Sequence, residues 1–348
     1  MTYFVSTKTV SEASRFSLMS LQTRLADGQK ELTTGRLIDV GESLGYETGK
    51  TVSLRQEFER LTQITETNVL VATRLAASQA AIKQMAGNAQ SFLDSLTGAR
   101  ESASAKATVA AAAKAGLAAL TDMLNTTAGG EYVFAGINTD MKPVAEYVAS
   151  PASAASTSVA AAFLAEFGFA QSDPAVSNIS SADMEAFLGG GFDGLFGAAS
   201  WSADWSSASD SNIRSRISTY ELIDTSANAN EQAFRDLAQA YTMVADLNVE
   251  TLNQNTYEAV LNAASKILGK AAQGIGDIQS RLGIAQQRVS NADERMALQV
   301  NILTEHINGL ETVDPYEAST KVSALITQIE TAYALTARVQ RLSLLNYL

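Results

Sequence analysis

The sequence of 348 residues contains no cysteine and only four prolines. Without cysteine, disulfide bonds, thiolate catalysis and cysteine-ligated metals are excluded. Three of the prolines, Pro143, Pro151 and Pro174, fall in one short stretch, and the fourth is Pro315. Because proline breaks the interior of a helix, the long proline-free stretches on both sides favour long helices.

Long apolar runs are also missing. The longest extends from Val159 to Ala165, which is too short to span a bilayer, so we expect no membrane partner. The first residues lack the apolar core of a cleavable signal peptide. We therefore expect a cytoplasmic protein, or one exported by a route that needs no cleaved signal.

Lys and Arg are outnumbered by Asp and Glu, 25 to 37, which gives a formal net charge of −12. An acidic chain of this kind argues against nucleic acid as a partner. The charge is unevenly spread. Residues 1–36 carry five Lys/Arg against three Asp/Glu, and residues 319–348 carry three against one. Nearly neutral ends on an acidic body favour association of the ends and solubility of the middle.

The first predicted helix covers about residues 8–34. Leucines three, four or seven residues apart place an apolar stripe on one face: Leu18, Leu21, Leu25 and Leu32. Gly35 is the predicted end of this helix. Residues 36–50 contain three glycines and are predicted to form a loop.

A second helix is predicted from about residue 51 to residue 126 because a heptad pattern runs through it. The a positions are Leu54, Leu61, Asn68, Leu75, Ile82, Ala89 and Leu96, and the d positions are Ile64, Val71, Ser78, Met85 and Phe92. The polar residue in an a layer, Asn68, predicts a fixed register at some cost in stability.

The composition changes after Gly129-Gly130. Tyr132 and Phe134 alternate with other residues as in a strand, and residues 213–226 predict more strand. Residues 140–210 are rich in Ala, Ser and Gly and hold six of the twelve phenylalanines and both tryptophans. This pattern predicts a small inserted domain with a core of its own.

Helical pattern returns near Asn230, and Asn255 with Glu258 predicts a capping box. Large apolar residues then hold one heptad register: Leu261, Leu268, Ile275, Leu282, Val289, Met296, Leu303 and Leu310. Smaller residues follow three positions later, at Ala264, Ala271, Ile278, Ala285 and Ala292. Small side chains at these positions allow a partner helix to approach closely.

Asp314 and Pro315 predict the start of a last helix, as its N-cap and its first residue. Its apolar residues are Val322, Leu325, Ile329, Ala332, Val339, Leu342 and Leu345. An apolar stripe so close to an end of the chain must be covered by the N-terminal helix or by another subunit. The leucine stripe of residues 8–34 and this one are therefore the predicted assembly interface.

These patterns predict a mainly α protein, in which N- and C-terminal segments form long antiparallel coiled-coil helices around a small inserted α+β outer domain. The expected parts are an N-terminal assembly helix and turn (1–40), a first long coiled-coil helix (41–128), a variable outer domain (129–226), returning coiled-coil helices (227–313) and a C-terminal assembly helix (314–348).

Chemical motifs are weak. Gly189–Gly194 matches G-x-G-x-x-G, but a helical pattern precedes it instead of a strand. Gly45–Thr51 is one residue short of a phosphate-binding loop, and His306 is the only histidine. We therefore predict no catalytic, cofactor-binding or metal-binding residue and no enzyme. A nucleotide-binding module using Lys50 and a regulatory coiled coil remain as alternatives.

Several segments resemble the flagellin superfamily, and within it the hook-associated protein 3 type of alphaproteobacteria. The segment from Gly130 to Pro143 resembles a signature that follows the first long helix in that family. Its matching residues are Gly130, Tyr132, Phe134, Gly136, Thr139 and Pro143. The turn Leu32–Arg36 and the ending Gln328–Leu348 also resemble the family.

The resemblance implies a structural subunit of the bacterial flagellum that joins hook to filament. The terminal helices would pair as the inner core of a tubular ring of identical subunits, with a hook-side hook-associated protein and flagellin as neighbours. It also implies type III export to the cell exterior without a cleaved signal, and an export chaperone on the C-terminal helix. The alternative within the same family is a flagellin, the filament subunit itself.

Overall fold

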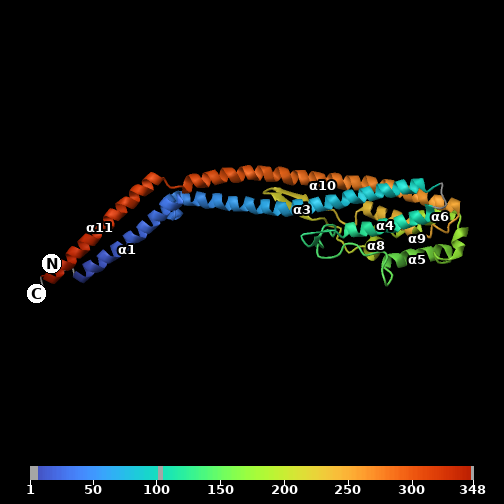
Figure 1. Ribbon diagram of the computed structural model, residues 1–348, viewed down its shortest axis with the longest axis horizontal. Helices are drawn as coiled ribbons and strands as arrows, with labels where there is room; N and C mark the ends of the chain where they lie inside the picture. Colours follow the sequence, from blue (N-terminus) through green and yellow to red (C-terminus); the bar gives the residue numbers. More distant parts are fainter. Residues whose placement is uncertain (1–6, 101–104, 346–348) are drawn as a thin grey trace. The chain divides into compact units, whose positions relative to one another are not determined.

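The computed structural model describes residues 7–100 and 105–345 and divides the chain into two compact units. Unit 1 consists of Met1–Thr62 with Ala297–Leu348, and unit 2 is Gln63–Met296. The helices α3 (Thr48–Gly98) and α10 (Gln254–Glu311) contribute to both units. Long packed helices with two small antiparallel sheets confirm the predicted mainly α fold (Figure 1).

Unit 1 begins with α1 (Thr7–Thr34), which ends before Gly35 as predicted, with that glycine in the left-handed region at φ +68°. α11 (Pro315–Leu345) begins at the predicted proline, and the Tyr316 N–H donates to Asp314 Oδ1 at 2.7 Å. The loop predicted over residues 36–50 is wrong. Asp39 caps a short helix, α2 (Val40–Leu44), a 3₁₀ turn (Gly45–Glu47) follows, and α3 then begins.

In unit 2, α3 and α10 pack side by side in opposite directions (Figure 1). Gln79 Nε2 donates to the Gln279 carbonyl at 2.8 Å, and Asn68 Nδ2 donates to Asp293 Oδ1 at 2.6 Å. The predicted heptad residues of this unit form the seam and are nearly all buried, among them Leu75, Ile82, Leu96, Leu261, Leu268, Ile275, Leu282, Val289 and Met296. In unit 1 the last two residues of the α10 pattern, Leu303 and Leu310, are only half-buried.

A β-hairpin lies against these two helices in unit 2. Its strands are β3 (Arg214–Ser218) and β4 (Glu221–Asp224), which confirms the strand predicted over residues 213–226. Asn68 Nδ2 donates to the Ile217 carbonyl at 2.9 Å, while Arg288 and Arg295, one heptad apart on α10, both pair with Glu221. Asn68, the polar residue in the helical seam, thus contacts both the hairpin and α10.

The single helix predicted over residues 51–126 is two helices. α3 ends at Gly98, and α4 (Lys106–Leu124) packs instead against α9 (Gln232–Asp246). The two approach closely at Gly116, where a Cβ would lie 2.3 Å from Tyr241 Cε1. By length and composition α4 would be able to cross a membrane, and 44% of its apolar window is buried in the fold.

The predicted insert contains more helix than strand. The strands β1 (Thr127–Ala128) and β2 (Glu131–Tyr132) flank Gly129 and Gly130, both with positive φ, as a type I′ turn requires. The rest consists of α5 (Ala154–Phe167), a 3₁₀ turn (Pro174–Asn178), α6 (Ser181–Gly189), α7 (Gly191–Gly194) and α8 (Ala198–Asp204). A chain of ring contacts from Phe163 to Trp205 forms the core of these helices.

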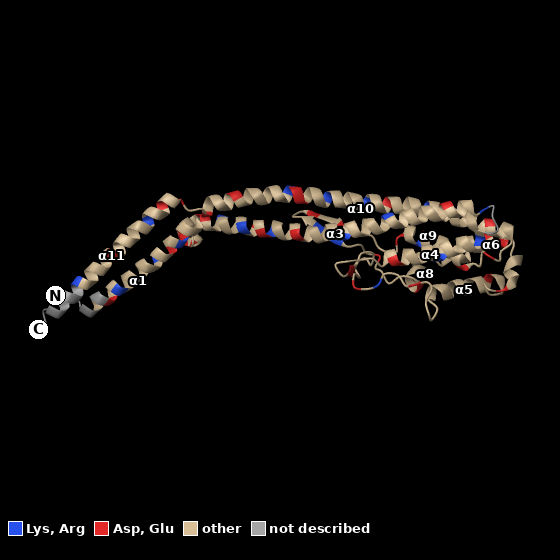
Figure 2. Cartoon of the chain, in the orientation of Figure 1, with Lys and Arg blue, Asp and Glu red and all other residues tan. Residues whose placement is uncertain are grey.

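The cap of α10 is Asn253 rather than the predicted Asn255, since Asn253 Oδ1 accepts from the Thr256 N–H at 3.0 Å. Lys/Arg and Asp/Glu residues are interspersed along α3 and α10 (Figure 2). Exposed ion pairs contribute little to stability, so the apolar seam provides most of the stabilisation between these helices.

Candidate assembly surface

In unit 1, α1 and α11 lie side by side and antiparallel (Figure 1). Gln22 Nε2 donates to the Tyr333 hydroxyl at 2.8 Å, and Lys321 Nζ lies 3.7 Å from Glu31 Oε2. Near Gly28 the helices are so close that a Cβ on this glycine would lie 3.2 Å from Val322 Cγ2. Glycine at this position therefore allows a close approach of the two helices.

The residues predicted as the assembly interface mostly form the seam between these two helices. Val322, Leu325 and Ile329 are buried, while the residues of the predicted stripes that are half-buried are Leu18, Leu21, Leu25 and Ala332. Leu32 is exposed, with 41% of its surface accessible. The side chains of Val339, Leu342 and Leu345 lie outside the described residues.

Other large apolar side chains of this helix pair are exposed and were missed by the sequence analysis. Phe16 is 78% exposed and Met19 66% exposed on α1, and Ile326 and Leu335 are exposed on α11. Phe16 precedes Leu18 by two residues, which places it about 200° away around the helix. A helical projection of residues 8–34 would have separated these two faces. The other face is at least partly covered by α11, so among the described residues the face with Phe16 is the more exposed one.

An open groove of about 480 Å³ runs between the two helices beside these exposed residues. Most of its lining side chains are small, namely Thr9, Ala13, Ser14, Ser17, Ala332 and Thr336, and Leu335 completes it. Small side chains on both walls leave room for a side chain from a neighbouring helix.

Replacement of Gly28 by leucine should separate α1 from α11. Leucine favours the helix itself by about 1 kcal/mol over glycine, so a loss of α1 structure would come from the collision with Val322. We expect faster amide hydrogen exchange in residues 20–32. Gly49→Leu, at a helical glycine of α3 with no neighbouring atom within 4 Å, is the matched control and should leave this exchange unchanged. Equal effects of the two substitutions would contradict the close approach.

The second predicted set, the family signature, lies in unit 2 and binds two distant chain segments together. The Ser209 N–H donates to the Ala135 carbonyl at 3.0 Å, and the Ile137 N–H donates to the Ser211 carbonyl at 3.1 Å. The Ala229 N–H donates to the Phe134 carbonyl at 2.8 Å. We call the segment from Gly130 to Pro143 the strap, because its backbone hydrogen bonds hold residues 209–211 and residue 229.

Each signature residue has a place in this strap. Gly136, at φ +63°, faces the Ser209 and Ser211 carbonyl oxygens, and a Cβ would lie 2.4 Å from the first. Phe134 is fully buried, Pro143 is buried, and the Thr139 carbonyl accepts from the Tyr132 N–H at 2.9 Å. Gly130 supplies the second positive φ of the β1–β2 turn. Backbone geometry thus accounts for the two glycines and burial for Phe134 and Pro143, while Tyr132 and Thr139 are joined through main-chain atoms.

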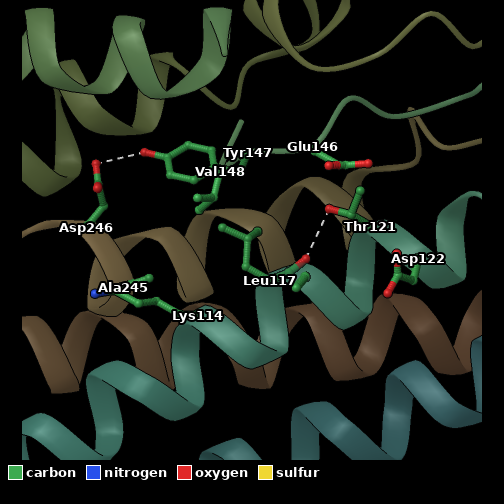
Figure 3. Close-up of a pocket in the computed structure, with 10 residues that line it drawn as sticks. Lys114, Leu117, Thr121, Asp122, Glu146, Tyr147, Val148, Ala245 and Asp246 are labelled. Carbon is green, nitrogen blue, oxygen red and sulfur yellow. Dashed lines mark hydrogen bonds between the residues drawn. The ribbon is translucent and has the colours of Figure 1, made fainter. Parts of the chain in front are cut away.

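A cavity of about 300 Å³ in unit 2 lies between α4, α9 and the chain around Tyr147 (Figure 3). The Tyr147 hydroxyl donates to Asp246 Oδ2 at 2.8 Å, and Gln171 Nε2 donates to the same oxygen at 2.9 Å. Burial raises the pKa of the Tyr147 phenol well above its ordinary value. The phenol therefore stays protonated and serves as a structural hydrogen-bond donor rather than as a base.

The weak motifs lie in helical surroundings. Lys50 is an exposed residue of α3, and a helix and a 3₁₀ turn precede it in place of the strand that a phosphate loop requires. Gly189–Gly194 joins α6 to α7, again with no preceding strand, and His306 is exposed on α10. Within residues 7–100 and 105–345 no group of three His, Asp or Glu side chains is placed to hold a metal ion.

Two family profiles match the chain. The bacterial flagellin N-terminal helical region matches residues 5–139, and the bacterial flagellin C-terminal helical region matches residues 265–348. Together they cover more than half of the chain. They include both assembly helices and the signature strap up to Thr139.

Among solved structures, the chain is similar to a protein from Vibrio parahaemolyticus that is provisionally assigned as a flagellar hook-associated protein. The TM-score is 0.53 at 8% sequence identity, and the match covers 77% of this chain and 99% of the other. At this identity the likeness is one of fold. A search of curated proteins found no match.

Proposed function

Because this chain belongs to the flagellin superfamily, we propose that it is the subunit that joins the flagellar hook to the filament. Membership of the family makes the chain a self-assembling structural subunit of the extracellular bacterial flagellum. The proposal concerns its position in that structure. The observation that carries it is the strap from Gly130 to Pro143, which resembles the hook-associated protein 3 type.

Two further features support a junction subunit. The fold of this chain matches 99% of the length of a protein that is provisionally assigned as hook-associated. The exposed apolar residues of α1 and α11, such as Phe16 and Met19, would contact neighbouring copies in a ring. A junction ring would meet a hook-side hook-associated protein below and flagellin above. The family match of both ends equally favours a flagellin, the second candidate.

Gold-labelled antibody and a gene deletion distinguish the two candidates. For a junction subunit, electron microscopy should show label in one band where hook meets filament, and the deletion strain should make bare hooks while releasing flagellin into the medium. Label along the whole filament, with this chain as the main protein of sheared filaments, would identify a flagellin and overturn the junction assignment.

Export by the flagellar type III route, without removal of an N-terminal signal and with a chaperone on α11, belongs to the same proposal. The exposed Ile326 and Leu335 on α11 are apolar side chains that a chaperone would cover before assembly. Mass spectrometry of the protein in isolated flagella should find an N-terminus at residue 1 or 2. A chain shortened by a signal-peptide length would contradict this route.

A further inference from the structure

Two chain turns lie side by side in unit 1, one after α1 and one after α10. The Leu37 N–H donates to the Glu311 carbonyl at 2.9 Å, and the Val313 N–H donates to the Gly35 carbonyl at 3.0 Å. Arg36 and Thr312 form an isolated antiparallel bridge between these two bonds. The exit of the chain from α1 and its entry into α11 are therefore held by one short backbone ladder.

The side chain of Glu311 fixes this ladder to α3. Its carboxylate accepts from Arg55 Nε at 2.7 Å and from Arg55 Nη2 at 2.6 Å, a bidentate pair. The Glu311 side chain is only 2% exposed, whereas that of Arg55 is 52% exposed. A carboxylate that is shielded in this way depends on its partner, because an unpaired charge there would have lost its solvation.

Other charged groups surround the same turn. Arg36 Nη2 donates to Asn308 Oδ1 at 3.2 Å, and Glu31, which is 7% exposed, accepts from the Ile38 N–H at 3.4 Å and faces Lys321 of α11. Glu59 of α3 adds a negative charge near Arg55. Among these groups, Glu311 contacts the ladder through its main-chain carbonyl. It also contacts α3 through its side-chain carboxylate.

We propose that Glu311 is a charge-dependent latch that locks the turn between α10 and α11 onto the turn after α1 and onto α3. When the carboxylate is ionised, Arg55 holds the last residue of α10 in place, and the backbone ladder forms on it. When the carboxylate is neutral, the ladder opens and the start of α11 is released. The pairing of α1 with α11 is thereby coupled to the charge of one side chain.

Electrostatics agree with this geometry. The hydrogen bonds from Arg55 hold the pKa of Glu311 below its ordinary value of 4.5, and Glu311 holds the pKa of Arg55 above its ordinary value. A depressed carboxyl pKa gives a contribution to stability that is complete above pH 4.5 and disappears as the pH falls through the lower, folded-state pKa. The latch is thus closed at neutral pH and opens in acid.

Hydrogen exchange of the full-length protein tests the latch. Glu311→Gln should reduce the protection of Leu37 and Val313 by about fivefold at pH 7, the upper end of the range for a half-exposed ion pair. Residues 254–296 of unit 2 should exchange as before. Glu57→Gln removes an exposed ion pair with Arg60 on the same helix and is the matched control. Equal protection in Glu311→Gln and the control would overturn the latch, as would a loss spread through unit 2.

Two further measurements guard against a merely misfolded variant. The double variant Arg55→Glu with Glu311→Arg restores opposite charges and should recover protection in the turn. Protection factors of the wild type, corrected for intrinsic exchange, should be constant above pH 4.5 and should fall as the pH is lowered below it, whereas those of Glu311→Gln should stay flat. No recovery in the swapped pair, or the same pH dependence in wild type and Glu311→Gln, would overturn the proposal. The latch does not depend on whether the chain is a junction subunit or a flagellin.

Discussion

Removal of residues 316–348 is expected to abolish assembly while leaving unit 2 folded. The removed segment contains nearly all of α11, whose buried side chains Val322, Leu325 and Ile329 lie on the seam with α1 in unit 1. Burial of each of these side chains contributes about 1.5–3 kcal/mol. Without α11, the leucines of α1 lose their cover, and the exposed surface proposed to contact neighbouring subunits loses half of its residues.

The two tryptophans make this prediction measurable. Trp201 and Trp205 are both buried in unit 2, so their fluorescence reports the unfolding of that unit alone. The truncated protein should remain monomeric in sedimentation under conditions in which the full chain polymerises. Its tryptophan fluorescence should change at the same temperature as in the full chain. Polymers of the truncated chain would contradict a role of residues 316–348 in assembly. A clear fall in this transition temperature would contradict the prediction that unit 2 folds without them.

Gly136→Ala is expected to be among the most destabilising single substitutions in unit 2. An alanine in the left-handed region costs about 1–2 kcal/mol. Its Cβ would also lie 2.4 Å and 2.7 Å from the Ser209 and Ser211 carbonyl oxygens. Both obstacles are backbone atoms, so the strap must shift and strain its two hydrogen bonds, each of which contributes about 0.5–1.5 kcal/mol. We expect a total loss of about 3 kcal/mol.

Gly130→Ala separates the two causes of this loss. Gly130 has φ +87° but no atom within 4 Å of a Cβ, so it carries the conformational cost alone, about 1–2 kcal/mol. Urea unfolding followed by tryptophan fluorescence gives both free energies of unfolding. Gly136→Ala should lie clearly below Gly130→Ala. Equal free energies of unfolding for the two variants would mean that the Ser209 and Ser211 carbonyl oxygens do not obstruct a Cβ at position 136.

Some features followed from local sequence. The heptad register from Leu261 to Met296 predicted the buried seam, because a repeat close to the helical period places the same face inward at every turn. Gly35, Asp314 and Pro315 marked helix ends correctly, since positive φ, capping and a fixed φ are properties of single residues. The strand predicted over residues 213–226 is present as β3 and β4.

Other features depend on contacts that sequence periodicity does not encode. The apolar, proline-free run from residue 51 to residue 126 gave no sign that α3 ends at Gly98 and that α4 packs on α9. The signature strap was recognised as a family motif, but its bonds join residues more than seventy positions apart. The Arg55–Glu311 pair joins two helices and likewise has no local pattern.

The sequence by itself determined that both ends are apolar helices, that long helices pack through a heptad seam, and that no cysteine is present for disulfide or thiolate chemistry. These follow from residue type and spacing along one helix. Only the tertiary structure decided which apolar residues of the ends are satisfied within the chain and which remain exposed. Leu18 and Phe16 are equally apolar, and the position of α11 alone makes one a seam residue and the other a candidate contact to a neighbour.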